Sequence, residues 1–78
     1  MHWELWSIPT MNMITDRATE ADALAVVREL LATGWTADEL SLIAEDEALA
    51  VEALPPALTG GELVRRAEQA SGASRRSA

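Results

Sequence analysis

The sequence predicts an α+β fold: a four-stranded, mostly antiparallel sheet in ββαββα order, with the helices on one face. Residues 2–8 alternate between polar and apolar positions in a way typical of a strand. Residues 20–33 carry apolar side chains at helical spacing, and prolines and glycines separate the later elements. With 78 residues and no cysteine, the chain is expected to form one small domain with a marginal core and no disulfide.

The opening strand, residues 2–8, places its two tryptophans on opposite faces of the sheet. Trp3 and Trp6 are three residues apart, and side chains on a strand alternate with period two. We expect Trp3 to share a face with Leu5, and Trp6 to share the other face with Ile8. The pattern leaves open which indole enters the core. The other indole lies on the opposite face of the sheet, and we expect another protein surface to cover it.

The first turn follows directly. Pro9 ends the strand because it has no N–H for a ladder hydrogen bond. Asn12 is expected to take a left-handed conformation in this turn, and residues 13–16 are expected to return as a short strand.

The helix predicted over residues 20–33 has a signal at each end. Thr19 and Asp22 form a capping-box pattern at its start, and Gly34 stands where a C-terminal glycine cap is expected. Trp35 is expected to fold back on the last turn. The apolar stripe that should face the core consists of Leu24, Val27, Leu30 and Leu31.

Residues 36–54 allow two interpretations. Thr36 and Glu39 repeat the capping-box pattern, and this favours a helix. Alternation within residues 39–44 and 49–54 instead favours two strands with a turn at the sequence DEA. We prefer the hairpin, although Ala and Glu favour helix by propensity.

The prolines at 55–56 predict a connection that continues neither a helix nor a central strand. Thr59 and Glu62 form a third capping-box pattern before a short helix. Its apolar face consists of Leu63, Val64, Ala67 and Ala70. The domain is expected to be residues 1–70, followed by a disordered tail at 71–78.

Three motifs stand in this order: Asn12 in the first turn, T-x-x-x-A-L-x-x-V-R from Thr19, and D-x-L-x-L-x-x-E-D from Asp38. Through them, most of residues 3–70 resembles a group of small uncharacterised bacterial α+β proteins. The resemblance implies the ββαββα order. It implies no activity, so no functional residue is carried over. The chain departs from the pattern at residues 46–50, where those proteins have a polar turn containing glycine.

Charge and hydropathy restrict the partners. The net charge is −7, and the six basic residues are all Arg. An acidic body repels nucleic acid and anionic lipid, so we expect neither as a partner. No run of apolar residues approaches the 18 of a membrane span. A bacterial protein located in the cytoplasm is therefore expected.

No pattern in the sequence predicts catalysis, a cofactor or a metal. The single histidine, His2, is expected on a frayed end. The acidic residues 45–47 lack the ligand spacing and the glycine of an EF-hand loop. Residues 59–62 place glycines before a helix but lack the lysine of a P-loop. We therefore expect a protein that is not an enzyme; an enzyme with a carboxylate-held metal is the weakest of the classes considered.

The outer face of the predicted sheet is the candidate site. Trp6, Ile8, Ile43 and Leu54 are expected to form an apolar patch there with a charged rim, and such patches usually mark interaction sites. The predicted function is a non-enzymatic protein–protein interaction module that acts as a homodimer or higher oligomer. The alternative is an acidic, antitoxin-like inhibitor that masks a basic partner protein.

Overall fold

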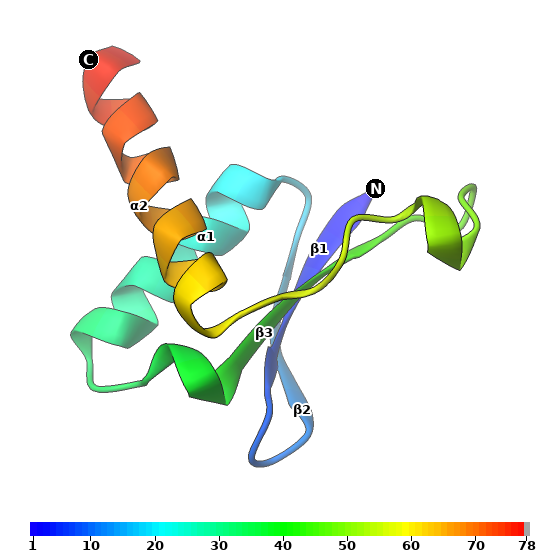
Figure 1. The fold of residues 1–78 in the computed structure, drawn as a ribbon, viewed down its shortest axis with the longest axis horizontal. Coiled ribbons are helices and arrows are strands. Elements are labelled where there is room, and N and C mark those ends of the chain that lie inside the picture. The colour runs from blue at the N-terminus through cyan, green and yellow to red at the C-terminus, as the bar shows by residue number, and fades with distance from the viewer. Residues whose placement is uncertain (78) are drawn as a thin grey trace.

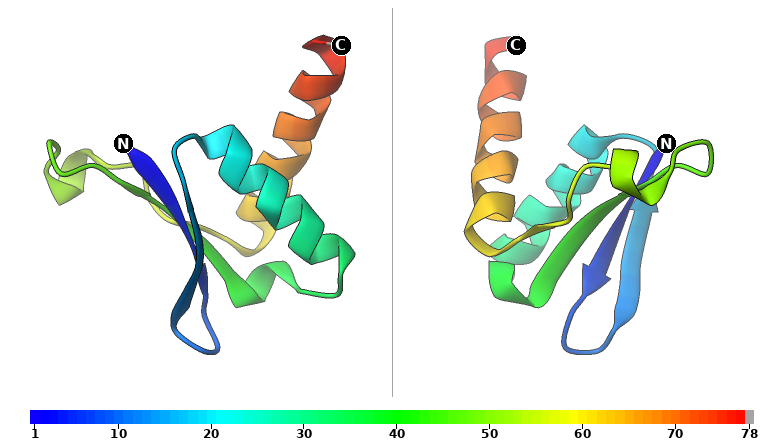
Figure 2. Two further views of the ribbon diagram at one scale, coloured as in Figure 1. Left: turned by 180° about the vertical axis from the view of Figure 1, so that it is seen from behind. Right: turned by 45° about the vertical axis from the view of Figure 1, so that its right-hand side comes forward.

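The structure is a computed structural model that describes residues 1–77, without the side chains of residue 51 and residues 71–77. Its four strands form one antiparallel sheet in the order β2-β1-β3-β4, and both helices cover the same face of the sheet (Figures 1 and 2). The elements are β1 His2–Ser7, β2 Asn12–Arg17, α1 Glu20–Ala32, the 3₁₀ turn η1 Ala37–Glu39, β3 Leu40–Glu45, the 3₁₀ turn η2 Val51–Ala53, β4 Leu58–Thr59 and α2 Gly60–Ser77. The predicted α+β class and the ββαββα order are confirmed.

The core lies between the sheet and the two helices. Leu5 and Leu42 point into it from neighbouring strands, and Leu24 and Leu63 meet them from α1 and α2. Trp3 is half-buried and packs against this cluster. The side chains of β1 therefore alternate as predicted, with Trp3 on the helix-covered face.

Both ends of α1 are capped at the predicted residues, although of the capping box predicted for Thr19 and Asp22 the described contacts include only the bond to the Thr19 hydroxyl. The Thr19 hydroxyl accepts a hydrogen bond from the Asp22 N–H at 3.2 Å, and this satisfies one free amide of the first turn. Gly34 has a φ of +109°, which glycine adopts without steric cost. This bend lets the Trp35 N–H donate to the Leu30 carbonyl at 3.1 Å, as in a Schellman cap. Trp35 packs against the core, as the sequence predicts.

The first turn differs from the prediction by one residue. Met11, with a φ of +56°, takes the left-handed conformation that was expected at Asn12. Asn12 instead begins β2, where it pairs with Ser7. The side chain that occupies the strained position is therefore a long apolar one, which is uncommon there.

Strand β2 contains a bulge. Leu5 pairs with Thr15 and Trp6 pairs with Met13, so Ile14 between them is passed over. Ile14 packs against the core, while Met13 stays on the opposite face beside Trp6. The extra residue thus changes the phase of β2 halfway along the strand.

The prediction for residues 36–54 is right for the first half and wrong for the second. Thr36 and Glu39 enclose only the short turn η1, in which Glu39 Oε1 accepts from the Thr36 N–H at 2.9 Å. The strand predicted over residues 39–44 appears as β3. The strand predicted over residues 49–54 does not form; this stretch contains η2 and extends past the end of β3 (Figure 1).

The fourth strand is Leu58–Thr59, which pairs with Leu42 and Ser41 after the two prolines. Residues 46–54 are rich in Ala and Glu, which fit a pleated sheet poorly. Asp46 also turns the chain, since its side chain accepts from the Ala48 N–H at 3.0 Å. The fourth strand therefore lies in the segment after the prolines, which was predicted to be a connection. Residues 49–54, which were predicted to be the fourth strand, form part of the connection instead.

Helix α2 is tied to α1 at two points. The Arg28 guanidinium donates to the Ala67 carbonyl at 3.1 Å, and Arg66 forms an ion pair with Glu20 at 2.7 Å. α2 continues to Ser77, past residue 70, where the sequence predicts the end of the domain. The predicted tail, residues 71–78, lies outside the residues whose side chains the structure describes.

Candidate functional site

The face of the sheet opposite the helices, called the outer face here, carries the candidate site. Glu4, Trp6, Ser41 and Ile43 point toward this face because they alternate with the buried positions of β1 and β3. Trp6 lies in β1, one of the two inner strands, with Met13 opposite it in β2 and Ser41 opposite it in β3. The outer face is divided into two halves of different chemistry.

The apolar half consists of Trp6, Ile8, Met11, Met13 and Ile43. A shallow depression of about 300 Å³ lies here, lined by Trp6, Ser7, Ile8, Met11, Ser41 and Ile43. None of these side chains carries a formal charge. Met11 stands at the tip of the β1–β2 turn with 75% of its surface exposed, and Ile8 and Met13 are also exposed.

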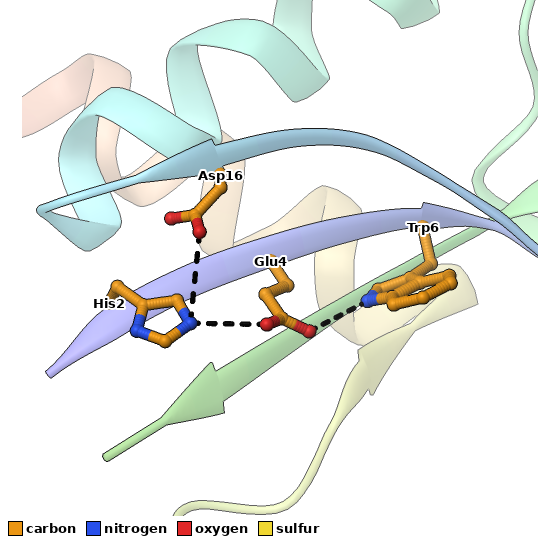
Figure 3. Close-up of polar contacts among 4 residues, drawn as sticks. All are labelled: His2, Glu4, Trp6 and Asp16. Atoms are coloured by element: carbon orange, nitrogen blue, oxygen red, sulfur yellow. Dashed lines mark hydrogen bonds and ion pairs between the residues drawn. The ribbon is translucent and has the colours of Figure 1, made fainter. Parts of the chain in front are cut away.

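The polar half consists of His2, Glu4, Asp16 and Glu45. Glu4 pairs with Asp16 across β1 and β2, and His2 pairs with Glu45 across β1 and β3. His2 Nε2 donates to Glu4 Oε2 at 3.1 Å and lies 3.8 Å from Asp16 Oδ2 (Figure 3). The three side chains thus converge from two strands.

Glu4 joins the two halves. Its Oε1 accepts a hydrogen bond from the Trp6 indole Nε1–H at 3.0 Å, while its Oε2 faces His2 (Figure 3). The polar edge of the indole is thereby satisfied, and the carboxylate is held in one orientation.

These contacts change the acid–base behaviour of both partners. The hydrogen bond to Glu4 raises the pKa of His2 above its ordinary value, with smaller contributions from the charges of Asp16 and Glu45 and a partial opposing effect of desolvation. The hydrogen bonds from His2 and Trp6 lower the pKa of Glu4. Both residues therefore keep their charged forms over a wider range of pH.

Three of the four predicted interface residues come together. Trp6, Ile8 and Ile43 line the same depression. Leu54 does not belong to it, because the strand predicted to carry it does not form; it lies between η2 and β4.

Sequence reasoning placed Glu4 and Glu45 in the charged rim of the outer face, but it missed Met11, Met13, His2 and Asp16. His2 lies on a paired strand rather than on a frayed end. The alternation of His2 and Glu4 could have shown that they share a face. The approach of Asp16 depends on the strand register and has no signal in the sequence.

A second depression, of about 370 Å³, lies on the side of the helices. Its lining includes Trp3, Pro55, Pro56 and Leu58 together with the Glu20–Arg66 ion pair. Because those two charges satisfy each other, the depression presents little unpaired polarity to a ligand. The outer face, with an uncharged half and a charged half, is the better candidate.

Comparison with known proteins adds no functional information. No family model matches the chain, and no curated protein or solved structure is significantly similar to it. The resemblance to small bacterial α+β proteins therefore stays a prediction. Among the helices that the structure describes, none has the length and hydrophobicity needed to cross a lipid bilayer.

Proposed function

We propose that this chain is a non-enzymatic interaction module that self-associates through the apolar half of its outer face. The observation that carries the proposal is an uncharged depression beside an exposed, projecting methionine. Exposed apolar patches with a polar rim usually mark interaction surfaces, and tryptophan is enriched among residues that dominate binding energy. As part of this proposal, we also place the protein in the cytoplasm, as the sequence predicts.

The partner we propose is a second copy of the same chain, because the surface offers both an apolar depression and a projecting apolar side chain. In a two-fold contact, a residue of one copy that touches a site on the other is repeated by symmetry. Met11 both lines the depression and projects from the turn above it. Two copies facing each other would each insert Met11 into the depression of the other, against Trp6 and Ile43.

The distribution of charge restricts how two copies meet. The chain has a net charge of −7, and Glu4, Asp16 and Glu45 gather on the polar half. Overlap of the two polar halves would bring like charges together and cost binding energy. We therefore propose that the apolar halves overlap, with the two polar halves at opposite ends of the pair.

The size of the domain also favours a partner. A chain of 78 residues has a small core and, lacking cysteine, no disulfide. Covering the apolar half would bury Trp6 and the exposed side chains of Ile8 and Met13, and thus would supplement that core.

Sedimentation velocity over a concentration series tests the proposal. Wild type should shift from monomer toward dimer as its concentration rises to high micromolar values. Trp6→Glu places a charge inside the contact and should remain monomeric. Leu49→Glu is the matched control: Leu49 is also exposed, but it does not line the depression.

The proposal is wrong if wild type remains monomeric at high micromolar concentration. It is also wrong if Leu49→Glu disrupts association as much as Trp6→Glu does. Circular dichroism of each variant separates loss of association from loss of fold.

The polar half supports the alternative, an acidic inhibitor that masks a basic partner protein. Glu4, Asp16 and Glu45 offer three carboxylates on one surface. Such binding would weaken steeply with salt and would depend on these carboxylates rather than on Trp6. A monomeric wild type, together with a neighbouring gene for a basic toxin, would favour this function.

A further inference from the structure

We propose that the polar half of the outer face binds one divalent ion of the zinc, cobalt and nickel class through His2, Glu4 and Asp16. The inference does not require self-association, because the three ligands lie outside the proposed interface and the contact is of a different kind; the two proposals share only Trp6. The sequence alone predicts no metal site, because only the fold brings these three residues together.

The strand register creates the geometry. His2 and Glu4 alternate on β1 and share a face, and Asp16 is the direct partner of Glu4 on β2. One ligand atom from each residue lies within 4.8 Å of the other two. The imidazole Nε2 is 3.1 Å from Glu4 Oε2 and 3.8 Å from Asp16 Oδ2. A tetrahedral ion about 2.1 Å from each ligand needs ligand atoms roughly 3.4 Å apart. The two separations from His2 Nε2 bracket this value, and the ligand atoms of Glu4 and Asp16 lie within 4.8 Å of each other, so side-chain rotations can complete the site.

The ligand types select the ion. One imidazole with two carboxylates is a mixed nitrogen and oxygen set, which suits zinc, cobalt and nickel. Magnesium prefers oxygen ligands and retains its water, so it should compete poorly. The two carboxylates carry two negative charges, which match a divalent cation when the imidazole is neutral. Glu45, which pairs with His2 across the sheet, adds a further negative charge nearby.

Trp6 supplies the support that a ligating carboxylate needs. Its Nε1–H holds Glu4 Oε1 at 3.0 Å, and this leaves Oε2 directed toward His2. Hydrogen bonds to metal ligands fix their orientation, and losing one typically weakens metal binding by about 10- to 100-fold. Trp6 is thus a positioning residue for the ion, and its indole also provides a fluorescent probe next to the site.

Titration with Zn²⁺ by calorimetry, and with Co²⁺ by visible absorption and tryptophan fluorescence, tests the proposal. Wild type should bind one ion per chain, and excess Mg²⁺ should not displace it. Asp16→Asn and Glu4→Gln should each weaken binding at least tenfold. Glu29→Gln is the matched control, since Glu29 is an exposed carboxylate on α1 and should change nothing.

Trp6→Phe separates this inference from the proposed function. Phenylalanine keeps an aromatic ring in the apolar half but has no N–H to hold Glu4. Metal binding should weaken about tenfold or more, while association should change far less than in Trp6→Glu. A variant that binds the ion as tightly as wild type would show that the hydrogen bond has no positioning role.

The main competing explanation is a chelate formed by the terminal amine and His2 alone. That chelate needs neither Glu4 nor Asp16 and would persist in the chain unfolded by urea. Unchanged binding in Asp16→Asn and Glu4→Gln, or equal binding by the unfolded chain, overturns the proposal. Absence of binding at millimolar Zn²⁺ also overturns it. Thermal unfolding of each variant without metal confirms that the fold is retained.

Discussion

The indole Nε1–H of Trp6 donates a hydrogen bond to Glu4 Oε1 at 3.0 Å, between two side chains that stand on the same face of β1. This contact joins the apolar and polar halves of the outer face. It holds the indole by its polar edge and leaves its apolar surface beside the depression. Both the proposed interface and the proposed metal site therefore depend on the orientation of this one ring.

The two tryptophans of β1 should respond differently to truncation. Trp6→Ala should weaken association by roughly 2 kcal/mol or more, as expected for an aromatic anchor of an interface. Trp3→Ala should instead lower the free energy of unfolding by about 3 kcal/mol, because Trp3 packs against the core. Sedimentation and urea denaturation of both variants measure the two effects. Similar effects of the two variants in both measurements would contradict this division of roles.

The strained turn should respond to Met11→Asn with two opposite effects. Asparagine tolerates a positive φ better than methionine does, so the free energy of unfolding of the monomer should rise by up to about 1 kcal/mol. Association should weaken, because the substitution removes the exposed side chain that is proposed to enter the depression of the second copy. Urea denaturation at low concentration and sedimentation at high concentration separate these effects. A variant that is less stable and still associates like wild type would show that Met11 has neither role.

The cap of α1 can be tested by Thr19→Ala. The Asp22 amide loses its acceptor, so the free energy of unfolding should fall by about 1 kcal/mol. Thr19→Ser keeps the hydroxyl and should lie within about 0.5 kcal/mol of wild type. Chemical denaturation of both variants provides the measurement, and an equal loss in the two would remove the hydroxyl as the cause.

The pH dependence follows from His2 and Glu4. Because the pKa of His2 is raised in the folded state, His2 contributes to the stability of the fold. This contribution is fully present below pH 6.5, the ordinary pKa of histidine, and is lost as the pH rises through the folded-state pKa. The lowered pKa of Glu4 also contributes to the stability of the fold. This contribution is present above pH 4.5, the ordinary pKa of glutamate, and is lost as the pH falls through the folded-state pKa. The His2–Glu4 pair should therefore stabilise the folded state most between pH 4.5 and pH 6.5.

An NMR titration of the His2 ring in chelator-treated buffer measures the shift directly. The midpoint should lie above the ordinary value of 6.5, and Glu4→Gln should move it back toward that value, because the first cause of the shift is the hydrogen bond that His2 donates to Glu4. Asp16→Asn should have a smaller effect. A midpoint that does not respond to Glu4→Gln would assign the shift to another group.

What the sequence could predict depended on whether the signal was local. The opposite faces of Trp3 and Trp6, the Thr19 cap and the Gly34 bend each depend on a few neighbouring residues, and all three predictions are confirmed. Strand β4 has only two residues, Leu58 and Thr59, and is defined by its pairing with β3, so no periodicity could locate it.

The candidate site shows the same limit. Trp6, Ile8 and Ile43 were found because they alternate along predicted strands. Leu54 was assigned by extending that alternation into a stretch whose Ala and Glu residues do not support a strand. The pairing of Glu4 with Asp16 requires the register of a hairpin that contains a bulge, and this register arises from tertiary packing.

The bulge at Ile14 has a consequence for how far assembly can proceed. An edge strand that is long and regular is a template for another strand, and edge-to-edge pairing can continue without limit into fibrils. β2 lies at the edge of the sheet, but its bulge interrupts the regular row of amide and carbonyl groups. Growth along the edge is thereby disfavoured, while the proposed contact through the outer face would occupy the apolar surfaces of both copies in a closed pair. The bulge in β2 is thus one of the features that make an edge strand a poor template for another chain.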